Sequence, residues 1–296
     1  MIIPKHIQLE STNGICTSRC EMCTIKSWTR KPDVMSLDVF VKILEKFKPY
    51  ISQVQYLTLH GCGEPLLDKG LAKKVEIAKS MGFKGTGFAT NCTELSEKVS
   101  KDLIKAGLDT IICSIDGIKK ETHETIRVGT NFEKVVKNVQ NFIKLRNNYG
   151  KTRVLVRFIR QELNKAEWPL FSKYWSEQLV KEYGDDVVKF DIHNWGGDLK
   201  DYESKDLNKD IPKEYLICGG IFERVKIYSN GDIALCDADD NGFFKMGNAI
   251  HFNPIEIYNN EIFNHHRKMM QDGRIRELEY CRNCTIPRSR YLKNRN

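Results

Sequence analysis

The chain has 296 residues, of which 41% are hydrophobic and 29% are charged, as in ordinary folded globular proteins. Its apolar runs are too short to span a bilayer, and the N-terminal MIIPKHIQLE is too polar for a signal-peptide core, so we expect a cytoplasmic protein without a membrane partner. The 47 Lys and Arg residues outnumber the 39 Asp and Glu residues, but the net charge of +8 is spread along the chain. This excess favours an anionic substrate and does not indicate nucleic acid binding.

Short β-branched runs alternate with amphipathic segments in the first two thirds of the chain, which is the pattern of β-α units around a parallel sheet. We expect six strands, within HIQLES, VQYLTLH, GTGFAT, DTIICSID, RVLVRFI and VVKFDIHN. Residues 36–47 and 131–145 have helical periodicity, and Ser36 is placed to cap the first of these helices. Six units are fewer than a closed eightfold barrel needs, so the sequence predicts an α/β fold with a partial (β/α)6 barrel.

The periodicity stops after Asn194, and residues 195–216 are polar and punctuated by Gly and Pro, as in a linker or an active-site loop. We therefore divide the chain into a barrel domain, residues 1–200, and a smaller C-terminal module, residues 201–296. Within that module, residues 222–237 predict a hairpin with its turn at Asn230-Gly231, and residues 259–271 predict a helix.

The ten cysteines of the chain are more informative than its composition, because cysteines in a reducing compartment are seldom disulfides. Three of them, Cys16, Cys20 and Cys23, follow the first strand in the sequence CTSRCEMC. Three thiolates from one loop can hold three irons of a [4Fe–4S] cluster, and the fourth iron then remains open to the amine and carboxylate of a small molecule. A structural zinc site is the alternative, but it needs a fourth ligand nearby, and the next candidates are His60 and Cys62.

This spacing after a strand resembles the signature of the radical S-adenosylmethionine (SAM) superfamily. The second strand ends in HGCGEPLLD, which is similar to the Gly-Gly-Glu-Pro motif of that superfamily, with Cys62 in place of the first glycine. The resemblance implies that backbone groups around Cys62, Gly63 and Glu64 hold the SAM amino group. It also implies that the SAM carboxylate is received by Ser114, at the end of the fourth strand, and by Arg127.

Asn91 and Met22 complete the SAM-binding residues that the resemblance implies. Both have a common structural role as well, because asparagine after a strand is frequent in turns and methionine is frequent in cores. Ser114 can likewise serve as a strand-end cap, and Arg127 can be a surface arginine.

A second set of cysteines, Cys218, Cys236, Cys281 and Cys284, lies in the C-terminal module. Four thiolates can close around either zinc or a [4Fe–4S] cluster, and their spacing does not decide between the two. A hairpin with two of the ligands and a terminal Cys-x2-Cys resembles the "twitch" module, the shortened form of the SPASM domain, which implies an auxiliary [4Fe–4S] cluster. Both cysteine sets resemble those of radical SAM dehydrogenases of the butirosin type, which oxidise a secondary alcohol of an aminocyclitol, 2-deoxy-scyllo-inosamine.

The resemblance implies an oxidoreductase that cleaves SAM reductively, abstracts hydrogen from a small polar substrate and passes an electron to the auxiliary cluster, with a flavodoxin- or ferredoxin-type protein as electron donor. His60 and His193 end the second and sixth strands and are candidate proton acceptors, although a structural histidine is the commoner case. Cys62 is a candidate hydrogen donor, as are Cys92 and Cys113, and a donor thiol would instead favour an epimerase. A peptide-modifying enzyme and a non-catalytic zinc protein remain alternatives, and the sequence does not name the substrate.

Overall fold

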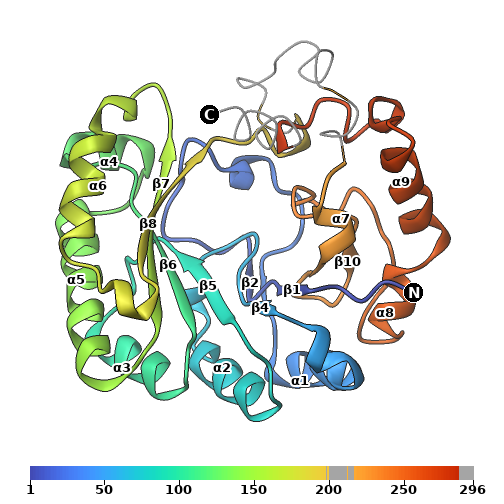
Figure 1. The fold of residues 1–296 in the computed structure, drawn as a ribbon, viewed down its shortest axis with the longest axis horizontal. Helices are drawn as coiled ribbons and strands as arrows, with labels where there is room; N and C mark the ends of the chain where they lie inside the picture. Colours follow the sequence, from blue (N-terminus) through green and yellow to red (C-terminus); the bar gives the residue numbers. More distant parts are fainter. Residues whose placement is uncertain (198, 200–211, 213–216, 287–296) are drawn as a thin grey trace.

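The computed structural model describes residues 1–197, 199, 212 and 217–286, and its centre is a single curved sheet (Figure 1). The sheet has eight strands in the order β10-β9-β1-β4-β5-β6-β7-β8. Neighbouring strands are parallel throughout, except that β10 runs antiparallel to β9. The strands are β1 (His6–Leu9), β4 (Tyr56–Thr58), β5 (Thr86–Thr90), β6 (Thr110–Ser114), β7 (Arg153–Arg160), β8 (Asp186–Asp191), β9 (Arg224–Ile227) and β10 (Ile233–Ala234).

Helices cover the convex face of this sheet, and Figure 1 shows α1 to α6 in an arc outside the strands. They bury the outward-facing residues of the strands, such as Ile7, Leu57 and Val156, in one apolar core. The helices are α1 (Leu37–Phe47), α2 (Leu71–Ser80), α3 (Glu97–Lys105), α4 (Lys120–Ile126), α5 (Phe132–Tyr149), α6 (Trp168–Ser176), α7 (Gly220–Glu223), α8 (Pro254–Tyr258) and α9 (Glu261–Gln271). A short ribbon of β2 (Thr12–Asn13) and β3 (Asp33–Val34) stands apart from the main sheet.

The six predicted strands are all present, and the predicted partial barrel is confirmed. The strand β4 is shorter than its apolar run: it ends at Thr58, the N–H of Leu59 makes one more hydrogen bond to Gly87 of β5, and His60 follows outside the strand. Ser36 caps α1 as predicted, since its hydroxyl accepts a hydrogen bond from the backbone N–H of Val39 at 3.2 Å. Among the described residues, no helix combines the length and apolarity that a membrane span requires.

The C-terminal hairpin joins the barrel sheet, which the sequence did not predict. The strand β9 pairs in parallel with β1, with Ile7 opposite Val225, and β10 turns back beside β9. The expected turn is present, because Gly231 adopts a left-handed φ of 85° and its N–H donates to the carbonyl oxygen of Tyr228. The division predicted at residues 200 and 201 lies outside the described residues. The hairpin nevertheless places one pair of predicted cluster ligands beside the first strand of the barrel.

Candidate functional site

The first cysteine set lies at the carboxyl edge of the sheet. The side chains of Cys20 and Met22 pack with Ile126, and Cys23 borders the same cluster. Burial raises the pKa of the Cys23 thiol to about 12, so a thiolate at this position needs a nearby cation or hydrogen-bond donors.

Donors to these sulfurs are present. The Ser18 hydroxyl lies 3.4 Å from the Sγ atoms of both Cys16 and Cys20, and the Ser18 N–H donates to Cys16 Sγ at 3.4 Å. Two longer contacts come from Asn91 Nδ2 to Cys16 Sγ at 3.7 Å and from Arg127 Nη1 to Cys20 Sγ at 3.6 Å. An all-sulfur ligand set with N–H and O–H donors around it is the environment in which iron–sulfur clusters are held and tuned. The residues present therefore fit such a cluster.

The HGCGEP motif is fixed against the cysteine loop by backbone contacts. The N–H of Gly14 donates to the carbonyl oxygen of Cys62 at 2.7 Å, and the N–H of Glu64 donates to the carbonyl oxygen of Ile15 at 2.8 Å. At Gly63, a Cβ atom would lie 2.6 Å from Thr12 Oγ1, so this position requires glycine. The predicted SAM-binding motif and the first cysteine set therefore form one unit.

Glu64 and Asn91 meet at the end of β5. The Glu64 carboxylate accepts hydrogen bonds from Thr90 Oγ1 at 2.7 Å and from the N–H of Asn91 at 2.9 Å, and burial raises its pKa. The Asn91 amide nitrogen donates to Thr17 Oγ1 at 2.9 Å. Glu64 thus orders the loop around Asn91 in this structure, besides any contact that it makes with a ligand.

The two predicted carboxylate-binding residues do not contact each other. Arg127 follows α4 and pairs with Asp116, with 2.7 Å between Nη2 and Oδ2. The hydroxyl of Ser114 instead accepts a hydrogen bond from Arg157 Nη2 at 2.6 Å. Burial and the nearby Arg127 lower the pKa of Arg157 to about 10, and the Nε atoms of both arginines are buried without a hydrogen-bond partner.

Arg157 was missed by the sequence analysis, although the sequence contains a signal for it. It lies on β7 between Val156 and Phe158, both fully buried, and alternation places its side chain on the opposite, concave face of the sheet. A charged residue at such a position of a central strand indicates a functional or paired group.

The candidate catalytic residues differ in their surroundings. His60 follows β4, and burial, reinforced by Arg157, lowers its pKa to about 3. Its Nδ1 atom is buried without a hydrogen-bond partner. His193 follows β8 and takes part in an interaction with another residue. The side chains of Cys62, Cys92 and Cys113 are all fully buried, which does not favour any of them as a hydrogen donor to substrate.

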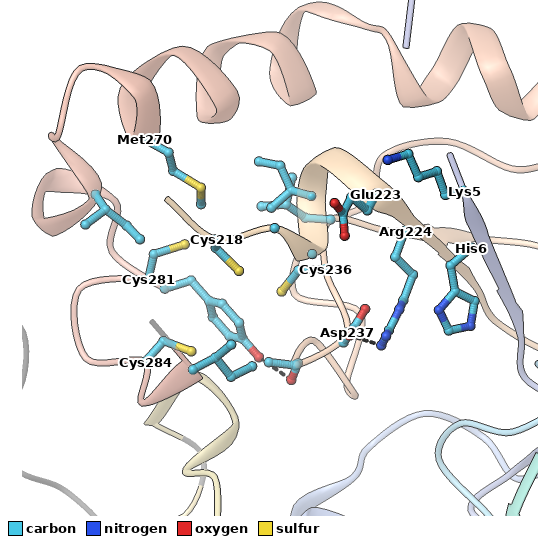
Figure 2. Close-up of a pocket in the computed structure, with 18 of the residues that line it drawn as sticks. Lys5, His6, Cys218, Glu223, Arg224, Cys236, Asp237, Met270, Cys281 and Cys284 are labelled. Carbon is cyan, nitrogen blue, oxygen red and sulfur yellow. Dashed lines mark hydrogen bonds and ion pairs between the residues drawn. The ribbon is translucent and has the colours of Figure 1, made fainter. Parts of the chain in front are cut away.

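The second cysteine set lines a cavity of about 560 Å³ at the C-terminal module. Figure 2 shows the sulfurs of Cys218, Cys236, Cys281 and Cys284 directed toward a shared space beside Met270. Burial raises the pKa of the Cys236 thiol well above its usual range, and the charges of the other three cysteines raise it further. Among the described residues, no three ligand side chains lie in the tight arrangement of a site for a single metal ion. Four converging thiols are a donor set that fits a [4Fe–4S] cluster.

Two family models match the chain. The radical SAM superfamily matches residues 11–158, and the SPASM iron–sulfur cluster-binding domain matches residues 218–285. The tungsten-containing aldehyde ferredoxin oxidoreductase cofactor-modifying protein of Pyrococcus furiosus is 28% identical over 176 residues, which cover 57% of this chain and 48% of that protein. The chain spans about half the length of the curated relatives that it matches.

The solved structures that share the fold include a BtrN complex and a SuiB complex. BtrN in complex with AdoMet and 2-DOIA has a TM-score of 0.65 at 20% identity, and the match covers 95% of this chain and 93% of BtrN. SuiB of Streptococcus suis bound to the precursor peptide SuiA has a TM-score of 0.71 at 14% identity, and the match covers 90% of this chain and 67% of SuiB. At these identities the similarity concerns the fold alone.

Proposed function

Because the chain belongs to the radical SAM superfamily and carries a SPASM iron–sulfur cluster-binding domain, we propose that it oxidises an alcohol of a small polar substrate such as a sugar or an aminocyclitol. When bound, SAM and its [4Fe–4S] cluster supply a 5′-deoxyadenosyl radical that removes a hydrogen atom from the substrate carbon, and an auxiliary cluster accepts the electron that the substrate then loses. The O–H proton leaves as well, so a C–H and an O–H bond are replaced by a C=O bond. An external flavodoxin- or ferredoxin-type protein supplies the electron that starts each turnover.

The chain's own residues would divide these tasks between the two cysteine sets. Cys16, Cys20 and Cys23 would hold the first cluster and leave one iron open, and the 62–64 motif and Asn91 lie beside them to bind SAM. The Ser114–Arg157 pair offers a hydroxyl at the end of β6 and a guanidinium on the neighbouring strand β7 for a carboxylate.

The arrangement of the second cysteine set is the observation that carries the proposal. Four thiols surround one cavity, so a cluster there would have a protein ligand for every iron and no open iron for substrate. Such a cluster is suited to electron transfer, which an oxidation requires and an epimerisation does not. The burial of Cys62, Cys92 and Cys113 supports the same choice, because an epimerase needs an accessible hydrogen donor.

The substrate oxygen also needs a proton acceptor. Burial lowers the pKa of His60 to about 3, so its ring is neutral at neutral pH and would be a weak base for this step. His193 lies past the end of β8, where the carboxyl edge of the sheet faces the same interior. Both histidines remain candidates for this role.

Product analysis tests the proposed function. Anaerobic protein with SAM and a strong reductant should convert a member of a panel of sugars and aminocyclitols into a product lighter by two hydrogens, with one SAM consumed for each product. Deuterium on the reacting carbon should appear in 5′-deoxyadenosine. A product that has lost no hydrogens and carries deuterium from solvent at the reacting carbon would show an epimerase instead.

A further inference from the structure

A buried aspartate of the C-terminal module reaches into the SAM-binding region of the barrel. Asp240 lies four residues after Cys236 and is 6% exposed. Its Oδ2 atom accepts a hydrogen bond from Thr24 Oγ1 at 2.9 Å, and its Oδ1 atom lies 3.1 Å from Cys62 Sγ. One carboxylate therefore contacts the residue after Cys23 and the residue that replaces a glycine of the motif.

The negative charge of Asp240 is held in place by a buried lysine. Lys226, on β9, is 1% exposed, and its Nζ atom lies 2.7 Å from Asp240 Oδ1. The same ammonium group donates to the carbonyl oxygens of Asp237 and Asp239. A buried ion pair is costly to form and costly to break, and these extra bonds fix the carboxylate in one position.

The backbone around Cys62 leaves this residue little freedom of its own. Its N–H donates to Glu10 Oε1 at 3.2 Å, and its carbonyl oxygen accepts from Gly14. Arg30 connects Glu10 to the C-terminal module, because its guanidinium pairs with Glu10 and donates to the carbonyl oxygen of Asp240 at 3.1 Å. The Cys62 thiol therefore connects this hydrogen-bonded backbone segment to Asp240 of the C-terminal module.

We propose that Asp240 is a positioning residue for the SAM site, acting through the Cys62 thiol and the Thr24 hydroxyl. A glycine in place of Cys62 would leave the carboxylate without its contact to the motif. Asp240 therefore holds the 62–64 backbone and the end of the first cysteine loop in the arrangement that receives SAM. This inference rests on the proposed radical SAM function and adds that the auxiliary module is part of the SAM site.

SAM affinity measured by anaerobic equilibrium dialysis tests this role, together with the electron paramagnetic resonance spectrum of the reduced first cluster with and without SAM. Asp240→Asn and Cys62→Ala should each weaken SAM binding about tenfold, as the loss of a residue that orients ligands typically does. Cys62→Ser keeps a donor and should retain most of the affinity. Combined, Asp240→Asn and Cys62→Ala should cost less than the sum of the two single losses, because both changes weaken the Cys62–Asp240 contact.

Asp185→Asn is the matched control. Asp185 is also a buried aspartate, paired with Arg146 at 2.6 Å, but it precedes β8 at the opposite edge of the sheet. Its replacement should lower the thermal stability and leave SAM affinity within about twofold of the wild type. If Asp240→Asn fails to fold, Cys62→Ala decides the question, since it leaves the ion pair intact.

Two results would overturn the inference. SAM affinity that is unchanged in both Asp240→Asn and Cys62→Ala would make Asp240 a purely structural ion pair. An equal loss of affinity in Asp185→Asn would make the effect one of general stability. Neither result touches the proposed function, which fails separately if the wild-type protein binds no SAM, and the inference would then fall with it.

Discussion

The indole nitrogen of Trp195 donates a hydrogen bond to the carbonyl oxygen of Met22 at 3.2 Å and so joins the end of the barrel to the first cysteine loop. The carbonyl oxygen of Trp195 in turn lies 3.4 Å from the hydroxyl of Tyr280, the residue before Cys281. Trp195 has a left-handed φ of 51°, which is strained for a bulky residue and persists only where its surroundings require it. This segment is a second connection between the two cysteine sets, besides Asp240.

Trp195→Phe should test that connection. The change keeps an aromatic ring and removes the N–H, so the carbonyl oxygen of Met22 loses its donor and the free energy of unfolding should fall by about 1 kcal/mol. Urea denaturation of the anaerobic protein measures the loss. Trp168→Phe is the control, because Trp168 packs against Phe158 and Phe171 through its rings. Equal losses in the two variants would mean that the Met22 contact contributes nothing specific.

Iron and sulfide analysis tests the two cysteine sets directly. Anaerobically purified protein should contain about eight irons and eight sulfides, from two [4Fe–4S] clusters. Replacing Cys16, Cys20 and Cys23 by Ala should remove about half of each and leave the brown absorbance of the remaining cluster. Cys92→Ala should keep the full content, because that thiol lies in the apolar core. A triple variant with unchanged iron would contradict the assignment of the first set.

Replacement of Arg157 and replacement of Arg127 should have different effects on SAM binding and on stability. Arg157→Met should weaken SAM binding by about 1.5–3 kcal/mol, because a charge-assisted contact from the guanidinium beside Ser114 is lost. Arg127→Ala should mainly lower stability, by about 3–5 kcal/mol, because the buried Asp116 loses the cation with which it pairs and keeps a hydrogen bond from the N–H of Ile159. SAM titrations and denaturant unfolding on both variants give the comparison. If Arg127→Ala lost SAM affinity while Arg157→Met did not, the carboxylate would belong to Arg127, as the sequence predicted.

Stability should fall in mild acid because His123 is buried in its neutral form. The pKa of His123 is lowered from 6.5 to about 3, mainly by burial and further by the positive charge of the nearby Arg127. Between these values the unfolded chain binds a proton that the folded chain does not, so the free energy of unfolding decreases as the pH falls. The expected contribution of His123 is about 2 kcal/mol between neutral pH and pH 5.

Urea denaturation at pH 7 and at pH 5 measures this loss. His123→Asn should reduce the pH dependence, since asparagine does not titrate and its side-chain oxygen can replace Nδ1 as the acceptor for the N–H of Asp116. A pH dependence identical in the variant and the wild type would show that His123 is protonated in the folded protein, or that other groups govern acid unfolding.

The strands and helices were predictable because their signals are local. Alternating β-branched residues marked each of the six barrel strands, and Ser36 marked a helix start. The pairing of β9 with β1 was not predictable in this way, because it joins residues more than two hundred positions apart and depends on backbone hydrogen bonds that any sequence can make.

The candidate site was likewise predictable where its signals are local and not where they depend on tertiary contacts. The cysteine sets could be identified from spacing, whereas the partners of each side chain follow from tertiary packing. Arg127 was expected to receive the SAM carboxylate, and the structure pairs it with Asp116 and places Arg157 next to Ser114, neither of which the spacing of residues indicated. Asp240 carried no sequence signal within its DADD run, because only the fold brings its carboxylate to Cys62.

The combined replacement of Cys281 and Cys284 by Ser separates an oxidation from a reaction without net redox change. If the second cluster accepts the substrate electron, the variant should still form 5′-deoxyadenosine from SAM, but the oxidised product should be lost. SAM binding should weaken as well, because the loop that carries Asp240 follows Cys236 in the same module. Chromatography of 5′-deoxyadenosine and mass spectrometry of the product measure the two outcomes in one reaction.

Folding must be separated from electron transfer in this variant, because losing a metal that organises a small module can also collapse its surroundings. Circular dichroism at saturating SAM should match the wild type before rates are compared, and Cys113→Ala, a buried cysteine outside both sets, should keep product formation. Deuterium should move from the substrate carbon into 5′-deoxyadenosine in both proteins, since that step precedes electron loss. If the double variant still formed oxidised product at the wild-type ratio to 5′-deoxyadenosine, the electron would have to leave by another path. The second cysteine set would then be a structural site, and its part in the proposed oxidation would be wrong.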